Sequence, residues 1–290
     1  MHPLRVKFEQ ELRIRGRAER TIHAYVTKVR ELSRYYRRSP EQISDEQIRA
    51  WLHHLIVHRG LAGETINVAV NAVRAFHALV LGRDRRAMSV GMPRHKCAPT
   101  RSEVYAVSEI EAMLRAPARA RDRAMLALVY ACGLRLDEAI KLRTGDVDAS
   151  RRQLRVRRGK GNKPRVLPLS VKLLALLREY WRAEREPAHR GSDLPLFVGV
   201  RNGRPLSKGT AQNIYYRAVR AAKIKRKAGI HTLRHSYATH LLEAGVPVTH
   251  VQQWLGHASL ITTVRYLHVT NGRIDPSALP LGLIDLAQSR

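Results

Sequence analysis

Cationic and nucleophilic side chains lie at short spacing in the second half of the chain. His231 and Arg234 are three residues apart in the segment GIHTLRH, so they share one face near the start of a predicted helix, where backbone N–H groups favour phosphate. His257 follows a glycine that ends a later helix, and Tyr266 comes nine residues further on, about two turns into the next predicted helix. Metal-free cleavage of a phosphodiester needs a nucleophile, cations around the non-bridging oxygens and an acid for the departing oxygen. These side chains could supply the first two.

Two upstream segments carry residues of the same kind. Arg135 stands just after the end of an apolar helix, and Glu138 lies one helical turn later, where its carboxylate could orient the guanidinium. The alternating segments QLRVRR and RVLPL flank the turn GKGNKP, which predicts a small β-hairpin with Lys160 in its turn.

Each of these residues alone is a weak signal, because tyrosines on apolar helices usually pack in cores and lysines beside glycine usually lie in solvated turns. His231 and His235 have the i, i+4 spacing of a metal-binding pair, but an HExxH glutamate is absent and Arg234 stands between them. We therefore expect no metal. We expect structural roles for four histidines: His235, His240, His250 and His268.

Composition narrows the class of partner. The 290 residues include 53 Lys and Arg against 24 Asp and Glu, a formal net charge of +29. This charge ranks nucleic acid ahead of an anionic membrane or an acidic protein. The sequence lacks an apolar run of about 18 residues and a secretory signal, so we expect no membrane partner and an intracellular location. Two cysteines without CxxC spacing predict neither a disulfide framework nor a thiol-rich zinc site.

Helical periodicity predicts that residues 1–82 form an all-helical domain. Two helices are expected over residues 3–38 with a break near Gly16, a third after a capping box of Ser44 and Gln47, and a fourth over residues 62–81. We expect residues 83–103 to form a basic linker. This linker could lie along DNA phosphates or could be a solvated tether. Residues 104–276 predict a mixed, mainly helical second domain. The leucine-containing tail 277–290 could dock on a neighbouring copy or on its own domain.

Five segments in order, GLRLDEA, RGKGNKPR, HTLRH, LGHAS and TTVRYLHV, resemble the catalytic boxes of the tyrosine recombinases, as in phage-type integrases and bacterial Xer-type enzymes. The segment RGRAERTIHAY, residues 15–25, is similar to their N-terminal core-binding domain, so the resemblance covers most of the chain. Asp137 stands where Ser is frequent, and Pro164 where a charged residue is common. Neither departure removes a catalytic group.

The resemblance implies a mainly α fold with a small β-hairpin or sheet. An N-terminal helical, SAM-like core-binding domain and a mixed α/β catalytic domain would form a C-shaped clamp on DNA. The implied activity is that of a site-specific DNA recombinase, cutting and rejoining strands through a 3′-phosphotyrosyl intermediate and a Holliday junction, with no cofactor, metal or ATP. It would serve DNA integration, excision or mobile-element movement as a homo-tetramer on paired double-stranded sites. The implied location is the bacterial cytoplasm, in association with the nucleoid. Accessory DNA-bending or transposition proteins are left open.

The resemblance also implies roles for individual side chains. Arg135 and Arg234 would clamp the scissile phosphate, because guanidiniums match phosphate geometry better than ammonium groups. Lys160 would be the general acid that protonates the leaving 5′ oxygen, with Lys163 as a nearby competitor. Glu138, by its spacing of one helical turn, would orient the guanidinium of Arg135.

The remaining implied roles concern the tyrosine and the DNA surface. Tyr266 would attack the phosphorus, His231 would assist proton transfer at the tyrosine, and His257 would donate to a non-bridging oxygen. Predicted DNA contacts are spread over both domains: Arg17, Thr21, Tyr25, Arg74, Lys163, Ser207, Lys208 and Asn213.

Two other functions would share parts of this pattern. A DNA-binding regulator or architectural protein could keep the fold without catalysis, but the presence of all six catalytic residue types argues against it. A type IB topoisomerase would share the phosphotyrosine chemistry and relax supercoils. The N-terminal helical domain favours recombination.

Overall fold

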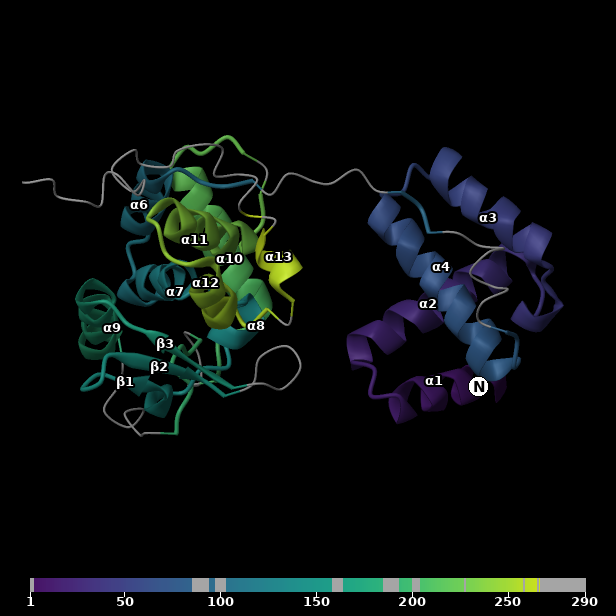
Figure 1. The fold of residues 1–290 in the computed structure, drawn as a ribbon, viewed down its shortest axis with the longest axis horizontal. Helices are drawn as coiled ribbons and strands as arrows, with labels where there is room; N and C mark the ends of the chain where they lie inside the picture. The colour runs from purple at the N-terminus through teal and green to yellow at the C-terminus, as the bar shows by residue number, and fades with distance from the viewer. Residues whose placement is uncertain are drawn as a thin grey trace, which may run out of the picture. The chain divides into compact units, whose positions relative to one another are not determined.

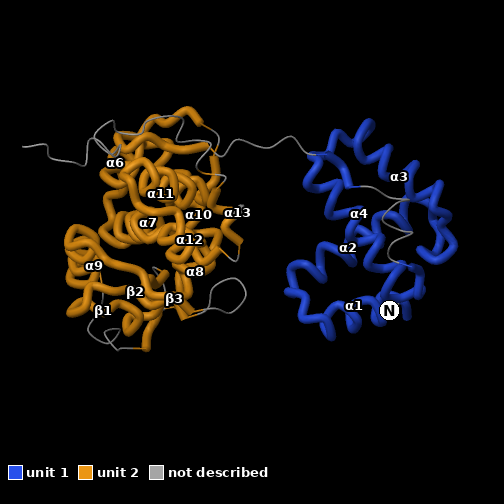
Figure 2. The backbone as a smooth tube through the Cα atoms, viewed as in Figure 1, with its two compact units in different colours: residues 1–100 blue, residues 101–290 orange. Residues whose placement is uncertain are grey.

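The structure is a computed structural model and describes residues 3–84, 94–96, 103–157, 164–184, 193–199, 204–226, 228–257, 259–264 and 266. The chain forms two compact units, Met1–Thr100 and Arg101–Arg290 (Figure 2). Lys160, Lys163, most of the predicted linker and the tail 277–290 lie outside the described residues. Within the described ranges, no helix has both the length and the apolar character needed to span a bilayer.

The first unit is built from helices in the order that periodicity predicts (Figure 1). They are α1 (Pro3–Ile14), α2 (Glu19–Tyr36), the 3-10 turn η1 (Pro40–Gln42), α3 (Asp45–Val57) and α4 (Gly63–Val80). The predicted break is a left-handed turn at Gly16, where φ is 63°. The predicted capping box is present: Ser44 Oγ accepts from Gln47 N–H at 3.2 Å, and Gln47 Oε1 accepts from Ser44 N–H at 3.0 Å.

Helix α4 joins two apolar clusters in the first unit. Its residues Ile66 and Val70 pack with Trp51 of α3 in one cluster. Phe76 belongs to the other cluster and meets Phe8 of α1 edge-to-face, with ring centroids 5.3 Å apart. Helix α2 also contributes to both clusters, through Leu32 in the first and Val29 in the second, so α2 and α4 together hold α1 and α3 in one unit.

The described part of the predicted linker is attached to α4. The side-chain amide of Asn67 donates to the carbonyl of His95 at 3.0 Å, and its oxygen accepts from the N–H of His95 at 2.9 Å. Both bonds satisfy backbone groups that would otherwise need water. Residues 94–96 therefore continue the surface of the first unit.

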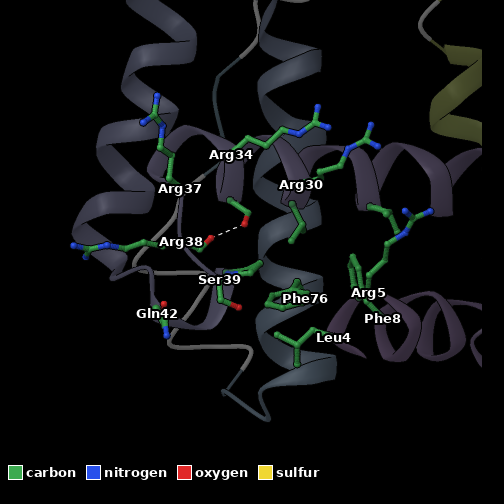
Figure 3. A pocket seen from close by; sticks show the side chains of 14 residues that line it. Leu4, Arg5, Phe8, Arg30, Arg34, Arg37, Arg38, Ser39, Gln42 and Phe76 are labelled. Atoms are coloured by element: carbon green, nitrogen blue, oxygen red, sulfur yellow. Dashed lines mark hydrogen bonds between the residues drawn. The ribbon is translucent and has the colours of Figure 1, made fainter. Parts of the chain in front are cut away.

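A cavity of about 730 Å³ opens between α1, α2, η1 and α4 (Figure 3). Its floor is apolar and includes Leu4, Phe8 and Phe76. Its rim is basic and consists of arginine side chains: Arg5, Arg30, Arg34, Arg37 and Arg38. The last four are exposed and make no ion pair within the described part of the chain. The cavity thus combines an apolar floor with an exposed cationic rim.

The second unit surrounds a larger core with helices and a small sheet (Figure 1). Its elements are α6 (Val107–Arg115), α7 (Ala120–Ala131), α8 (Leu136–Ala139), η2 (Thr144–Asp146), β1 (Val147–Asp148), β2 (Gln153–Val156), β3 (Arg165–Pro168), α9 (Val171–Glu184), α10 (Lys208–Ala221), α11 (His231–Glu243), α12 (Val248–Leu255) and α13 (Leu260–Val264). The apolar helix α7 packs against both α9 and α11. It is almost fully buried and therefore forms the centre of the unit.

The predicted hairpin is present and belongs to an antiparallel sheet of order β1-β2-β3. Leu154 of β2 pairs with Leu167 of β3, and both side chains face the core because alternate residues of a strand point to one side. Strand β1 has two residues, too few for alternation to reveal it in the sequence. The hairpin fixes where the predicted Lys160 segment leaves and re-enters the sheet.

Tyr266 lies beyond α13 and not two turns inside a longer helix, which corrects the expectation from the sequence. Helix α13 ends at Val264, and the N–H of Tyr266 donates to the carbonyl of Thr263 at 3.0 Å in a turn. The run Ile261, Thr262, Thr263 and Val264 is β-branched throughout, and such residues lose side-chain freedom in a helix. The helix is therefore short, and the tyrosine leaves it.

Candidate active site

The carboxylate of Glu138 on α8 lies buried between three guanidiniums. Its Oε1 is 2.8 Å from Arg135 Nη1, its Oε2 is 2.7 Å from Arg165 Nη2, and its Oε2 is 4.0 Å from Arg234 Nη1. Burial alone would raise the pKa of Glu138, but hydrogen bonds and positive charge from Arg165 and then Arg135 outweigh it, so the pKa lies below its usual value. The carboxylate stays ionised and fixes the orientation of the arginines.

Arg234 is 5% exposed and is held by two backbone carbonyls at helix ends. Its Nη1 donates to Gly133 at 2.5 Å after α7, and its Nη2 donates to Leu255 at 2.6 Å at the end of α12. Burial, then the charge of Arg135, lowers the pKa of Arg234 to about 10, so it remains a cation at pH 7. Gly133 has a φ of 54°, and a Cβ there would lie 2.3 Å from Tyr237 Cδ1. A glycine is therefore required beside this guanidinium.

Arg165 is a site residue that sequence reasoning missed. It is the first residue of β3, and its Nε donates to the carbonyl of Trp254 at 2.7 Å while its guanidinium binds Glu138. It thus connects the sheet, α8 and the end of α12. Its place in RGKGNKPR, directly after the turn that carries Lys160, is the signal that could have found it.

His257 follows the left-handed Gly256 that ends α12, and its Nδ1 lies 2.9 Å from the hydroxyl of the fully buried Thr263. Burial, then the charges of Arg234 and the two other arginines, lowers the pKa of His257 to about 4, so the ring is neutral at pH 7. When the Thr263 hydroxyl donates to Nδ1, the neutral ring carries its proton on Nε2 and can donate there. Thr263 is a second residue that sequence reasoning missed.

The phenol of Tyr266 is 5% exposed and lies between two histidines. Its hydroxyl is 2.8 Å from His235 Nδ1, and its ring stacks on that of His257 with centroids 6.3 Å apart. The sequence predicts a structural role for His235, but the structure brings it against the predicted nucleophile. The spacing that could have revealed this is i, i+4 between His231 and His235, which places both on one helix face.

His231 is exposed at the first residue of α11, next to Lys208 of α10. Partial desolvation, then the charges of Lys208 and Arg234, lowers the pKa of His231. Lys208 Nζ is paired with Asp137 of α8, with both carboxylate oxygens at 2.9 Å. The cation predicted to contact DNA is therefore already held by the acidic residue that departs from the family pattern. Among the described residues, no three His, Cys, Asp or Glu side chains are grouped as metal ligands.

The other predicted DNA contacts of the second unit lie on α10. Ser207 caps this helix, and its hydroxyl accepts from the N–H of Thr210 at 3.1 Å. Asn213 is exposed two turns later. Lys163, like the predicted general acid Lys160, lies in the segment between β2 and β3 that is outside the described residues.

The predicted DNA contacts of the first unit lie at the start of α2 and on α4. Arg17 is exposed just before α2, and Thr21 and Tyr25 follow on one face of that helix, both partly buried. Arg74 is partly buried on α4, and burial, then the charge of Arg94, lowers its pKa.

Both units match known protein families. Residues 103–273 match the phage integrase family, and residues 4–86 match the N-terminal SAM-like domain of phage integrases. The chain is 34% identical over 274 residues to the tyrosine recombinase XerD of Halalkalibacterium halodurans, covering 90% of each chain. It is 33% identical over 285 residues to the tyrosine recombinase XerC of Mycobacterium leprae, covering 92% of this chain and 95% of the relative.

Solved structures show the same fold. A lambda integrase dimer bound to a core site has a TM-score of 0.72 at 20% identity, covering 90% of this chain and 96% of that chain. The XerH recombinase bound to a palindromic difH substrate has a TM-score of 0.71 at 22% identity, covering 91% and 80%. The predicted fold class, mainly helical with a small sheet and a SAM-like first domain, is confirmed. The chain belongs to the phage integrase family, the site-specific tyrosine recombinases.

Proposed function

We propose that this protein binds duplex DNA at a recombination site and cuts and rejoins its strands through Tyr266. The observation that carries the proposal is the arrangement around Glu138, where three buried or half-buried guanidiniums are fixed in place. The neutral His257 adjoins them, and its ring stacks on the phenol of Tyr266 with centroids 6.3 Å apart. A fixed cationic pocket beside a buried phenol suits attack on a phosphodiester.

In this mechanism, Arg135 and Arg234 bind the non-bridging oxygens of the scissile phosphate. Their orientation is set in advance by Glu138 and, for Arg234, by two carbonyls, so little reorganisation is needed when charge develops in the transition state. His257 donates from Nε2 to a non-bridging oxygen. These groups supply the positive charge and hydrogen bonds that a pentacoordinate phosphorus requires.

Tyr266 Oη attacks the phosphorus, the bond to the 5′ oxygen breaks, and Lys160 protonates that oxygen. The product is a 3′-phosphotyrosyl linkage, which keeps the energy of the phosphodiester, so a 5′-hydroxyl from another strand reverses the step without ATP. Two such exchanges pass through a Holliday junction. His231, at the N-terminus of α11, is the residue to which the family resemblance assigns proton transfer at the tyrosine, and a helix start also suits it to phosphate.

The proposed partner is a double-stranded recombination site. The net charge of +29 supports it, as do the core-site and difH DNA in the lambda integrase and XerH structures. We assign residues 1–82 to a core-binding domain, 83–103 to a basic linker and 104–276 to the catalytic domain, closing on DNA as a C-shaped clamp. Strand exchange between two duplexes calls for a homo-tetramer, in which the tail 277–290 docks on a neighbouring copy.

The test is a nicked suicide substrate made from the DNA that flanks this protein's own locus. The full-length protein should form a covalent protein–DNA adduct, and Tyr266→Phe should form none. Tyr130→Phe is the matched control, because Tyr130 is also hydrogen-bonded to a histidine of α11, at 2.8 Å, and should keep the adduct. An adduct that survives Tyr266→Phe would exclude the proposal. Supercoil relaxation by monomeric protein without strand exchange would favour a topoisomerase.

A further inference from the structure

His235, which the proposed catalytic set does not include, contacts the reacting oxygen. Its Nδ1 lies 2.8 Å from Tyr266 Oη, with ring centroids 5.5 Å apart. Tyr266 is 5% exposed and His235 is half-buried, so bulk water has limited access to this contact. His231, one turn earlier on the same helix face, is exposed. The position beside the phenol oxygen is therefore held by His235.

The surroundings of His235 keep it neutral before DNA binds. Burial, then the charges of His231 and Arg234 from its own helix, lowers the pKa of His235. From the segment after α12, His257 and Tyr266 face it, and His257 is itself neutral at pH 7. A neutral imidazole with its proton on Nε2 accepts the Tyr266 hydroxyl hydrogen at Nδ1.

We propose that His235 is a catalytic residue that takes the proton from Tyr266 Oη during attack and returns it during rejoining, an inference that rests on the proposed recombinase chemistry. In cleavage, the Oη–P bond forms, the P–O5′ bond breaks, the Oη proton passes to His235 Nδ1, and Lys160 gives a proton to O5′. In rejoining, a 5′-hydroxyl gives its proton to Lys160 and attacks phosphorus, the Oη–P bond breaks, and Oη recovers the proton from Nδ1.

The bound phosphate controls when this transfer occurs. Without DNA, Arg234 opposes a second positive charge on His235. The scissile phosphate and its more negative transition state offset the charge of Arg234, so His235 becomes a better base when the substrate is in place. The tyrosine therefore stays protonated until a phosphodiester occupies the pocket.

The same helix carries an internal comparison. His240 Nδ1 lies 2.8 Å from the hydroxyl of Tyr130, and the ring centroids are 5.9 Å apart. This pair has the same two residue types and the same distance as His235 and Tyr266. Only desolvation raises the pKa of Tyr130, with no charged side chain contributing. His240 therefore provides a histidine–tyrosine contact away from the arginines against which His235 can be tested.

The experiment measures single-turnover adduct formation on the nicked suicide substrate between about pH 6 and 9. It compares the full-length protein with His235→Asn, His231→Asn and His240→Asn. Asparagine can place its amide oxygen where Nδ1 lies and accept the same hydrogen bond, but it cannot take up a proton. We expect His235→Asn to slow adduct formation at pH 7 by about 10²- to 10⁴-fold, the usual contribution of a positioned base. Its rate should climb with pH, whereas the wild-type rate levels off above about pH 7.

The controls separate proton transfer from packing. His240→Asn should stay within about twofold of wild type, with the same pH profile. His231→Asn should keep the wild-type shape of the profile even if the rate falls. A His235→Asn rate within about threefold of wild type, or above it, would overturn the proposal, and so would the altered profile appearing in His231→Asn instead.

A second substrate tests which oxygen His235 serves. Sulfur in place of the bridging 5′ oxygen leaves as a thiolate that needs no proton, so this substrate should rescue Lys160→Ala and leave His235→Asn slow. Rescue of His235→Asn would move the residue to the leaving-group side and contradict the inference. If His235→Asn does not fold, as judged by urea unfolding and DNA binding, His231→Asn on the sulfur substrate decides: a plateau above about pH 7 supports His235, and a tenfold rise per pH unit overturns it.

If the protein is not a recombinase that acts through Tyr266, the adduct assays give a different result. In that case the wild-type protein forms no adduct on either substrate, or the adduct survives Tyr266→Phe. If only the His235 inference fails, the wild-type protein and all three histidine variants still form an adduct that depends on Tyr266.

Discussion

The two units use arginine in opposite ways. In the second unit, Arg165 and Arg234 are buried and Arg135 is 24% exposed, and all three surround the carboxylate of Glu138. In the first unit, arginines ring an apolar cavity, are exposed, and make no ion pair within the described residues: Arg30, Arg34, Arg37 and Arg38 (Figure 3). The first arrangement fixes the direction of each guanidinium through its partners, and the second leaves the charges in solvent, where salt screens them.

Burial explains this difference. A buried cation without a partner is costly, so the second unit requires Glu138 and helix-end carbonyls before it can place guanidiniums in its interior. The result is a set of donors with fixed directions, as a reacting phosphate needs. An exposed arginine has water as its partner and needs no such support. It attracts polyanions in general, without a direction fixed in advance by the protein.

Of the changes that test this comparison, removing the carboxylate of Glu138 should have the largest effect. Glu138→Gln leaves buried guanidiniums without their counter-charge, and we expect the second unit to lose about 3–5 kcal/mol in free energy of unfolding. Urea unfolding measures it. Glu179→Gln is the matched control, because Glu179 pairs with Arg123 at 3.4 Å but is 49% exposed, and it should cost well under about 1 kcal/mol. Equal losses for the two variants would show that burial does not distinguish them.

Replacing one buried guanidinium should reduce the rate by the next largest amount. Arg234→Lys keeps the charge but cannot donate to both Gly133 and Leu255 while binding phosphate. We expect adduct formation at saturating DNA to slow by about 10²- to 10³-fold. Arg34→Lys in the first unit should leave this rate unchanged within about twofold. A similar loss in both variants would contradict a directional role for the buried cluster.

A buried titratable group without a partner extends the comparison to the first unit. His77 is fully buried in α4, and neither ring nitrogen has a hydrogen-bond partner within the described residues. Burial, then the charge of Arg83, lowers its pKa to about 4. The unfolded chain therefore binds more protons between about pH 6.5 and 4, so stability is complete above about pH 6.5 and is lost as the pH falls through this range.

His77→Leu should remove this acid sensitivity, which we expect to amount to about 2 kcal/mol. Hydrogen-exchange protection of α4 amides at about pH 6.5 and 4.5, corrected for the intrinsic exchange rate, measures it. His23→Leu, at an exposed position of α2, is the control and should leave the wild-type loss of protection in place. An equal loss of protection in His77→Leu and wild type would assign the sensitivity to another group.

The smallest effect is expected at the exposed arginines. Arg34 lies on the side of α2 opposite to Thr21, because each residue turns the helix by about 100°, and Arg37 is the left-handed residue that follows the end of α2. Arg34→Gln with Arg37→Gln should weaken DNA binding by less than about tenfold at physiological salt, with a smaller difference at high salt. Arg17→Gln, before the predicted DNA face, should weaken binding more. A larger loss from the double variant would move the DNA surface to the cavity side.

Local sequence patterns predicted most of the fold. Periodicity predicted α1 to α4, the capping box at Ser44 and the β2–β3 hairpin, because each depends on residues within a few positions of one another. The same logic missed β1, with its two residues, and extended α13 past its β-branched end. Segments that are short, or in which propensity and periodicity conflict, are the ones that local patterns predict least well.

The candidate site, like the fold, could be predicted only in part from the sequence. The sequence by itself determined which residue types are present, their order in five segments and the strong positive charge, and these were sufficient to indicate the family and Tyr266. Only the tertiary structure decided that Arg165 shares Glu138 with Arg135, and that His235 holds the phenol. Those contacts join residues 27 and 31 positions apart, and Arg234 reaches Gly133 across 101. Such contacts arise from the packing of α7, α11 and α12, which no local spacing in the chain encodes.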